Sequence, residues 1–570
     1  MSDLAKYNRN FVPKNYKISD WNSLKPFFDQ LVEREINALS DLRIWLQDRS
    51  ELETIVSEDA GWRYIRMTCD TENEEKQQAY NFFITEIEPS IQPYSNKLDT
   101  KLLESPFKNE FSSKADQILV RSTENHHKTF REQNIPLLTE IQQGQVKYGN
   151  TIGSLQVTID GEEMTLQKAS IKLFDTDRNV RENAYNAIQN TRLTVKNDLD
   201  GLFDSLIVLR NDVAKNAGFS NFRDFMFVEL CRFDYTPQDC FNFHQAIEAE
   251  VVPLLNDLAI ERKKGLGLAK LRPFDLSVDI QNRTALKPFS NGKELTDKTI
   301  EVFNRIDKNI GQVIKSLEDN GHLDLESRKG KAPGGYNYPL YETGYPFIFM
   351  NSVGALRDLV TMVHEGGHAL HSVLTHPLEL VNYKNFPSEV AELASMSMEL
   401  LSMEHWDVFF EDSEQLNRAK KEHLESIIET LPWVATIDKF QHWLYENPNH
   451  TVGERTNAWN EIHSSFISKE IDWTDLQAVK DNIWQKQLHL FEVPFYYIEY
   501  GMAQLGAIAV WKNFKENPAK GLKQYIEALK LGYTRSISEI YEVAGVKFDF
   551  SQKYIKELMD FVKLELKSLD

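Results

Sequence analysis

The sequence predicts a large, mostly α-helical protein with at least two lobes, and three observations predict this fold class. At 570 residues, the chain is much longer than one ordinary domain. Its 41% hydrophobic and 26% charged residues are typical of a globular protein with a large core. Along most of the chain, apolar residues recur at spacings of three and four, as the buried face of an amphipathic helix requires.

The first part of the chain has mainly helical patterns. Residues 74–89 and 113–135 carry such patterns, and so do residues 22–39, whose apolar positions are Leu24, Phe27, Phe28, Leu31, Ile36 and Leu39. One β signal follows, where Val157 and Ile159 alternate with polar residues before the turn pair Asp160-Gly161 and predict a hairpin. Helical patterning then resumes, with Thr176 or Asp177 as its cap.

We therefore expect a helical N-terminal lobe at residues 1–165 and a helical second region at residues 166–570.

The net charge and the cysteine content of the chain limit its expected partners and cellular compartment. A formal net charge of −21 argues against binding to nucleic acid, which needs a basic surface. The chain has three cysteines without a C-x-x-C spacing, Cys69, Cys231 and Cys240, which indicates structural thiols in a reducing compartment. Without a signal-peptide pattern or an apolar run of about 18 residues, the sequence predicts a cytoplasmic protein with no membrane partner.

The second region contains an H-E-x-x-H pattern at residues 364–368. On a helix, an offset of four residues returns to the same face, so His364 and His368 can reach one metal ion with Glu365 beside them. We expect Asn351 or Ser352 to cap this helix, and Pro377 to end it at His376.

Two adjacent glycines lie inside the predicted helix, although each costs about 1 kcal/mol relative to alanine. Gly366 and Gly367 would let another strand or a substrate approach the backbone beside a metal. The alternative, two surface histidines on an ordinary helix, gives no reason for these glycines. We therefore interpret the segment as a metal centre.

A catalytic zinc ion needs a third protein ligand and an open fourth position. The helix predicted after the cap Ser388 presents Glu389, Glu392 and Glu399 on nearly one face, and by spacing alone either of the first two could ligate. An acidic first turn favoured by the helix dipole would also explain Glu389. Glu399 and His371 are candidates for orienting a ligand by a hydrogen bond, with a solvated helix position as an equal alternative for His371.

Six segments in a fixed order make the chain recognisable. They are KAPGGY (331–336), PFIFMN (346–351), TMVHEGGHALH (361–371), FPSEVAELAS (386–395), HLFEVPFYYIEYGMAQLGA (489–507) and LGYTRSISEIYEVAGVKFDFS (531–551). Together they resemble the thimet oligopeptidase/oligoendopeptidase F family of zinc metallopeptidases, on its oligoendopeptidase side. The resemblance covers roughly residues 165–560, and the N-terminal part fits more loosely.

This resemblance implies a mostly α-helical, two-lobed metallopeptidase with a deep central channel and a small β element near the site. It implies one Zn²⁺ per chain, held by His364, His368 and Glu392, because the family's E-x-A-S pattern begins at Glu392 rather than Glu389. It also implies that Glu365 is the catalytic carboxylate.

The resemblance further assigns His489 and the tyrosines after it to contacts with the substrate carbonyl and the transition state. Tyr500 is the preferred tyrosine, and Tyr496 and Tyr497 compete for the other role. The strand-like PFIFMN is either an edge strand that pairs with an extended peptide or a buried strand of a small sheet. The glycines of KAPGGY form either a mobile loop over the channel or a turn.

The predicted activity is zinc-dependent hydrolysis of internal bonds in short, unstructured oligopeptides, with Glu365 as general base and then acid. Two alternatives stay open. One is a zinc carboxypeptidase of related helical fold, and the other is a non-catalytic peptide-binding protein. The predicted oligomeric state is a monomer or a small homo-oligomer.

Overall fold

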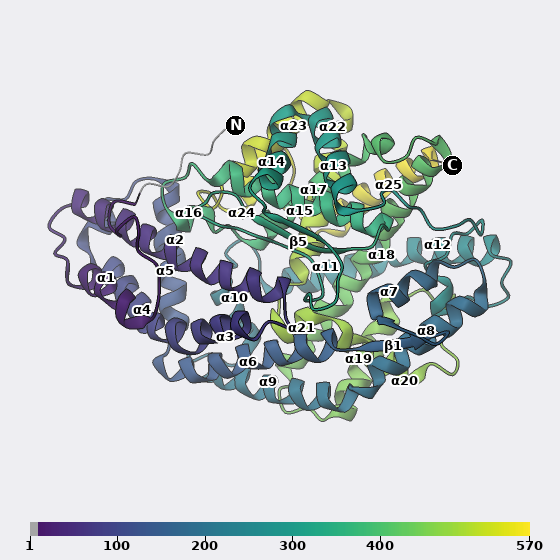
Figure 1. Cartoon of the computed structure of the whole chain (residues 1–570), viewed down its shortest axis with the longest axis horizontal. Helices are drawn as coiled ribbons and strands as arrows, with labels where there is room; N and C mark the ends of the chain where they lie inside the picture. Colours follow the sequence, from purple (N-terminus) through teal and green to yellow (C-terminus); the bar gives the residue numbers. More distant parts are fainter. Residues whose placement is uncertain (1–8, 570) are drawn as a thin grey trace.

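The N-terminal part of the chain is a group of helices, drawn in purple and blue in Figure 1. The structure is a computed structural model that describes residues 9–569. The group consists of α1 (Trp21–Glu33), α2 (Leu39–Cys69), α3 (Glu74–Phe82), α4 (Glu88–Glu104), α5 (Lys114–Thr129) and α6 (Ile135–Gly153). Its core includes Leu24, Trp45 and Leu102, and is completed by Leu380 and Tyr383 from a much later segment. The later region thus packs directly on these helices, and a division at residue 165 stays a prediction.

The first predicted helix, residues 22–39, ends earlier in the structure than the pattern predicts. Helix α1 ends at Glu33, because Arg34 adopts an extended conformation (φ −60°, ψ 128°), and α2 begins at Leu39. The helix ends between Leu31 and Ile36, where the step between successive apolar positions of the pattern widens from three to five.

The predicted hairpin is confirmed as β1 (Gln156–Ile159) and β2 (Glu162–Thr165), which pair antiparallel. The turn residues Asp160 and Gly161 have φ values of 56° and 82°. Two consecutive positive φ angles match the twist of the strands and favour an Asp-Gly pair. After the hairpin, Asp177 accepts a hydrogen bond from the Asn179 N–H and caps the next long helix, as one of the two alternatives predicts.

Eight helices form the middle of the chain. They are α7 (Leu166–Ser170), α8 (Arg178–Thr194), α9 (Lys196–Asn216), α10 (Phe222–Glu229), α11 (Pro237–Glu250), α12 (Val252–Gly265), α13 (Gly292–Ile306) and α14 (Lys308–Asp319). Helices α6 and α9 run beside each other along the lower edge of the molecule in Figure 1.

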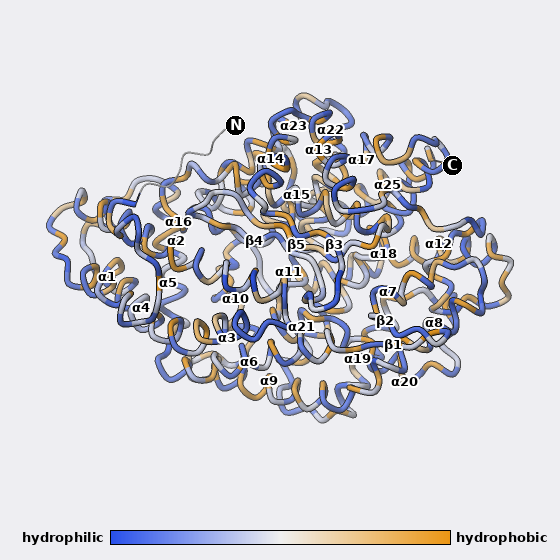
Figure 2. Tube along the Cα trace, in the orientation of Figure 1, coloured by the Kyte–Doolittle hydropathy of each residue, from blue (hydrophilic) through white to orange (hydrophobic). Residues whose placement is uncertain are grey.

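A three-stranded sheet follows, with the order β3-β5-β4. Its strands are β3 (Leu323–Glu326), β4 (Tyr336–Tyr338) and β5 (Phe347–Ser352), and β5 is parallel to β3 and antiparallel to β4. The segment PFIFMN is therefore mostly the buried central strand, and the edge-strand interpretation is wrong. β5 appears orange at the centre of the molecule in Figure 2. Gly334, with a φ of 96°, lies in the turn that leads into the edge strand β4.

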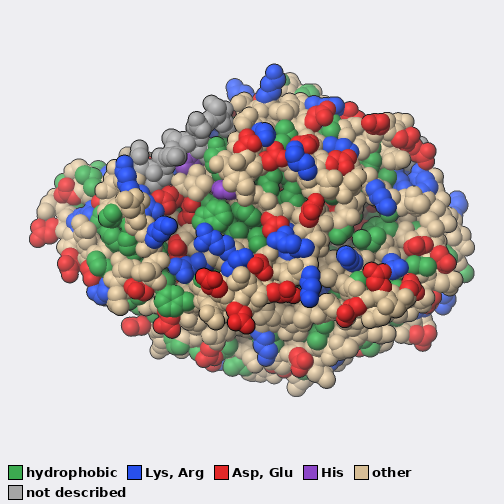
Figure 3. Space-filling view, in the orientation of Figure 1, with side chains coloured by type: hydrophobic (Ala, Val, Ile, Leu, Met, Phe, Trp, Pro, Cys, Tyr) green, Lys and Arg blue, Asp and Glu red, His purple; other side chains and the backbone are tan. Residues whose placement is uncertain are grey.

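The last part of the chain is again helical. It comprises α15 (Leu356–Thr375), α16 (Val381–Lys384), α17 (Ser388–Met403), α18 (Ser413–Glu446), α19 (Val452–Phe466), α20 (Gln477–Asn482), α21 (Leu488–Glu492), α22 (Ile498–Glu516), α23 (Pro518–Leu529), α24 (Ile537–Val543) and α25 (Gln552–Ser568). Helices α15, α17 and α22 pack together in the largest core. Between residues 9 and 569, no helix has the length and apolarity needed to cross a membrane. Figure 3 shows acidic and basic side chains interspersed over one face.

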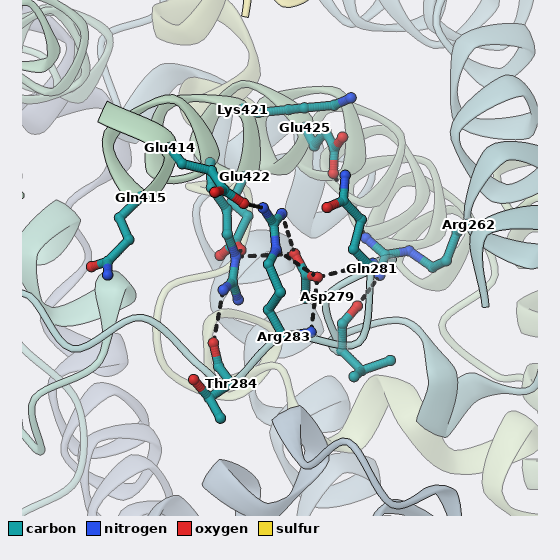
Figure 4. Close-up of polar contacts among 12 residues, drawn as sticks. Arg262, Asp279, Gln281, Arg283, Thr284, Glu414, Gln415, Lys421, Glu422 and Glu425 are labelled. Carbon is teal, nitrogen blue, oxygen red and sulfur yellow. Dashed lines mark hydrogen bonds and ion pairs between the residues drawn. The ribbon is translucent and has the colours of Figure 1, made fainter. Parts of the chain in front are cut away.

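An ion-pair network ties the loop between α12 and α13 to α18 (Figure 4). The nearly buried Asp279 lies 2.9 Å from Arg283 Nη2 and 3.0 Å from Arg418 Nε. Arg283 also reaches Glu414 on α18 (2.6 Å), and Arg262 on α12 donates to the Val278 carbonyl. Because Asp279 is shielded from solvent, these pairs hold the loop more firmly than exposed ion pairs would.

Candidate metal centre

Helix α15 carries the H-E-x-x-H pattern, and its ends are set by its sequence. Asn351 and Ser352 belong to β5, so the prediction that either caps the helix is wrong. The Asp358 carboxylate instead accepts hydrogen bonds from the N–H groups of Val353 (2.8 Å) and Ala355 (2.9 Å) just before the helix. The helix ends at Thr375, next to the predicted end at His376, although His376 itself keeps helical backbone angles (φ −51°, ψ −37°) before Pro377.

Three side chains converge between α15 and α17. His364 and His368 lie on one face of α15, with ring centroids 4.9 Å apart. Glu392 projects from α17, and its Oε2 lies 3.3 Å from His364 Nε2 and 3.6 Å from His368 Nε2. One potential ligand atom from each residue lies within 4.8 Å of the others. Two imidazoles and one carboxylate make up a donor set that zinc uses in catalytic sites.

Further hydrogen bonds orient these groups. The Nδ1 of His364 lies 2.6 Å from Glu399 Oε1, so its N–H can donate there while Nε2 faces Glu392. This is the position expected for a carboxylate that orients a ligand. Tyr496 OH donates to Glu392 Oε1 (2.7 Å). Burial disfavours the charged form of Glu392, but His368 and His364 outweigh it and lower the pKa of Glu392 to about 2.

The two glutamates that spacing alone could not separate face different partners. Glu389 lies one turn before Glu392, and its Oε1 accepts a hydrogen bond from Tyr235 OH (2.6 Å). Arg232 pairs with Glu499 (2.8 Å) and also interacts electrostatically with Glu389. Of the two, only Glu392 joins the cluster with the histidines.

Glu365 follows His364 on α15 and has one carboxylate oxygen without a partner in the described part of the chain. Its side chain is buried, and its Oε2 makes no hydrogen bond to any residue from 9 to 569. Burial raises the pKa of Glu365 to about 7. A divalent cation bound nearby would lower that pKa, because it favours the ionised carboxylate.

His489 lies against all three candidate tyrosines, with ring centroids 5.9 Å from Tyr496, 4.8 Å from Tyr497 and 5.6 Å from Tyr500. Its Nε2 lies 3.4 Å from Tyr500 OH. Tyr496 reaches Glu392, whereas the burial of Tyr497 raises its pKa to about 12 and its hydroxyl interacts with Trp433 and Gln487. The structure thus groups His489, Tyr496 and Tyr500 near Glu392, whereas the Tyr497 hydroxyl faces Trp433 and Gln487.

Gln487 is a site residue that sequence reasoning missed. Trp433 Nε1–H donates to Gln487 Oε1 (2.9 Å), which leaves the Gln487 amide nitrogen to donate to His489 Nδ1 (2.7 Å). Burial lowers the pKa of His489 to about 4, so the ring is neutral near pH 7 and carries its proton on Nε2. His489 is therefore a hydrogen-bond donor toward the site. The only sequence signal was the position of Gln487 two residues before His489.

His371 takes neither of its two expected positions. It is fully buried, and its ring stacks on Phe386 with centroids 3.6 Å apart. His371 therefore packs beneath the segment that precedes α17 and does not reach the converging ligands or solvent.

The two glycines let other elements approach α15. A Cβ on Gly366 would meet the Phe303 ring at 2.6 Å, and a Cβ on Gly367 would meet the Ser395 Cα at 2.7 Å and the Ala394 carbonyl oxygen at 2.8 Å. The element that approaches Gly367 is thus the backbone of α17, rather than a strand or a substrate. Gly367 brings the helix that carries Glu392 close to the helix that carries the histidines.

Replacing Gly367 with alanine should lower the free energy of unfolding by about 1–3 kcal/mol, the usual cost of overpacking. The contacts are backbone atoms of α17, so no side-chain rotation can relieve them. The measurement is urea unfolding, with Gly201→Ala in α9 as the control. In the described structure a Cβ at Gly201 meets nothing within 4 Å, so that variant should gain up to about 1 kcal/mol. Equal stability of the two variants would contradict the packing argument.

A cavity of about 800 Å³ lies between the N-terminal helices and the segments that carry Glu389 and Tyr496. Its walls include Arg49 of α2 and Arg131 on the N-terminal side, and Ser388, Glu389 and Tyr496 on the other. The cavity thus reaches α17 and the tyrosine segment from the side of the N-terminal helices.

Comparisons with known proteins agree with this architecture. Oligopeptidase PepF of Bacillus subtilis (strain 168) is 24% identical over 68% of this chain and 57% of its own length. Oligoendopeptidase F homolog of Lactococcus lactis subsp. lactis (strain IL1403) is 22% identical over 72% of this chain and 66% of its own. The matched part of the chain thus spans less than two thirds of either relative.

Solved structures match over nearly the whole chain. A putative oligoendopeptidase F superposes with a TM-score of 0.93 at 26% identity and covers 99% of both chains. PZ peptidase A, solved with an inhibitor, gives a TM-score of 0.93 at 26% identity over 98% of this chain and 100% of its own. The predicted mostly helical fold is confirmed. Residues 11–130 match the description "Peptidase M3 N-terminal domain", and residues 173–560, more than half of the chain, match "Peptidase family M3". The chain therefore belongs to peptidase family M3.

Proposed function

We propose that this chain is a cytoplasmic zinc endopeptidase that hydrolyses internal bonds of short, unstructured oligopeptides. The observation that carries the proposal is the convergence of His364, His368 and Glu392 next to the buried Glu365, whose Oε2 has no hydrogen-bond partner in the described part of the chain. Membership of family M3 and the oligopeptidase names of the relatives support the same activity.

The residues between α15 and α17 fit one zinc ion. His364, His368 and Glu392 would hold it, and Glu399 would fix the orientation of His364 through Nδ1. When bound, zinc would supply a Lewis acid that polarises a peptide carbonyl and makes water more acidic. Two histidines and one carboxylate leave a fourth coordination position for substrate or water.

Glu365 would act as the general base and then the general acid of the reaction. As a general base, it takes a proton from the attacking water, and as a general acid it then gives that proton to the leaving amine nitrogen. Its position next to His364, and an Oε2 that has no hydrogen-bond partner within residues 9–569, suit this double role.

Tyr500 and His489 would stabilise the negative charge that develops on the carbonyl oxygen. Both are donors at neutral pH, because burial holds the pKa of Tyr500 well above its usual value and the neutral His489 carries its proton on Nε2. Tyr496 is the less suitable donor, since its hydroxyl already binds Glu392.

Replacing Tyr500 with phenylalanine should lower kcat by a factor of about 10²–10³ with little change in KM, as the loss of one oxyanion donor does. The measurement is steady-state hydrolysis of a fluorogenic peptide. Tyr185→Phe is the control, because the buried Tyr185 hydroxyl has no partner within the residues that the structure describes. Full activity of Tyr500→Phe would remove this residue from the proposed oxyanion site.

The edge strand β4 offers a place for an extended substrate. Among the described strands, β4 pairs only with β5, which leaves its other edge for main-chain hydrogen bonds to a peptide. Asn337 of β4 donates to the main-chain oxygen of Glu365 (3.2 Å), so a peptide along this edge would run beside the catalytic residues. An extended chain is required, which favours unstructured oligopeptides as substrates.

A mixed peptide library, analysed by mass spectrometry with and without a chelator, tests the proposal. We expect internal fragments, loss of cleavage with chelator, and recovery with added Zn²⁺. Removal of single C-terminal residues would instead indicate a carboxypeptidase. Binding without cleavage by the zinc-loaded protein would indicate a peptide-binding protein.

A further inference from the structure

A second group of metal-binding side chains lies between α11 and α18. Cys240 and His244 are four residues apart on α11, and Asp438 and His442 are four residues apart on α18. An offset of four places both members of each pair on one helix face. All four side chains are buried, and none is more than 2% exposed.

The distances bring three of these groups to one point. One potential ligand atom each from Cys240, Asp438 and His442 lies within 4.8 Å of the others, the same limit that the catalytic cluster meets. His442 Nε2 lies 3.3 Å from Asp438 Oδ2. His244 Nε2 lies 2.8 Å from the same oxygen, so its N–H can donate there and orient the carboxylate.

Several polar atoms of this cluster have no hydrogen-bond partner in the part of the chain that the structure describes. They are Asp438 Oδ1, His244 Nδ1 and both ring nitrogens of His442, whose Nε2 lies within ion-pair distance of Asp438 Oδ2 but makes no hydrogen bond to it. A buried polar atom left unsatisfied costs about 1–3 kcal/mol, so each such atom calls for an explanation. Pairing of the two imidazoles with Asp438 Oδ2 would still leave Asp438 Oδ1 without a partner among the described residues.

We propose that Cys240, Asp438 and His442 form a second zinc site, with His244 orienting Asp438. A thiolate, an imidazole and a carboxylate together suit Zn²⁺ among the common divalent metals. The complete burial of the site assigns it a structural role. This proposal is independent of the peptidase activity, because it shares no ligand with the α15–α17 cluster.

The second site lies directly behind the tyrosine segment. The His442 ring packs edge-on against Phe495 (5.5 Å, 83°), and the neighbouring Gln441 accepts a hydrogen bond from the Phe495 N–H (2.6 Å). Phe495 has a φ of 68°, an unfavourable value for a bulky residue, and it immediately precedes Tyr496. A metal that fixes α18 against α11 would help to hold this strained backbone and thus the tyrosines.

The test is metal content together with cobalt spectroscopy on the full-length protein. Protein purified without chelator should contain two zinc ions per chain. After exchange with Co²⁺, a cysteine ligand should give sulfur-to-cobalt charge-transfer absorption in the near ultraviolet, whereas the ligands of the α15–α17 cluster contain no sulfur. One zinc ion per chain and no such absorption in the wild-type protein would overturn the proposal, and neither measurement requires a variant to fold.

Variants then assign the signal to residues. Cys240→Ser should lose the absorption and one metal ion, whereas the control Cys231→Ser, at another buried cysteine, should keep both. His364→Ala should lose the other metal ion and keep the absorption. If Cys240→Ser retained the absorption, or if Cys231→Ser lost it, the assignment would be wrong.

Discussion

Replacing Glu365 with glutamine should lower kcat by a factor of about 10²–10⁴, the usual contribution of a general acid–base group, while zinc content stays unchanged. Glutamine keeps the size of the side chain but cannot accept and return a proton at neutral pH. Because the Glu365 side chain is buried and its Oε2 makes no hydrogen bond within residues 9–569, the substitution removes no hydrogen bond from that oxygen. The variant should therefore lose activity while it keeps its zinc.

Two measurements on each variant make this result decisive. Peptide hydrolysis gives kcat, and elemental analysis gives zinc per chain. Glu461→Gln, an exposed glutamate on α19, is the matched control and should behave as the wild type in both. Near-normal turnover of Glu365→Gln would show that another group moves the proton, and a loss of zinc would show that Glu365 supports metal binding instead.

Features of the fold that depend only on residues close together in the sequence could be predicted. The four-residue offset of His364 and His368 is a property of any α-helix, and the Asp160-Gly161 turn is a property of two residues with positive φ. The structure agrees with both. Even the break between α1 and α2 had a local sign in the five-residue spacing, although the pattern alone did not identify it as a helix end.

The parts that depend on packing could not be predicted in the same way. Spacing left Glu389 and Glu392 equivalent, because only the angle between α15 and α17 determines which carboxylate faces the histidines. The need for a glycine at position 367 could likewise not be predicted, because the helix that packs against it lies later in the chain. For the α11–α18 cluster, His244 and Asp438 are 194 residues apart in sequence, and no local pattern joins them.

A series of three glutamine substitutions on α17 should separate the roles of its glutamates. Glu392→Gln should remove most zinc from the α15–α17 site and with it the activity, because the carboxylate is both the proposed third ligand and the negative charge between the two imidazoles. Glu399→Gln should weaken zinc binding by a factor of about 10–100, the usual effect of losing a group that orients a ligand. Competition with a chromophoric chelator measures both affinities.

Glu389→Gln completes the series as the control on the same helix. Its carboxylate bonds Tyr235 rather than the histidines, so its loss should change stability but leave zinc affinity within about threefold of the wild type, well below the orienting effect. The order of zinc loss, Glu392 first, then Glu399, then Glu389, follows from which oxygen atoms face His364 and His368. If Glu389→Gln released zinc while Glu392→Gln kept it, α17 would have to be rotated in solution, and the proposed ligand set would fail with it.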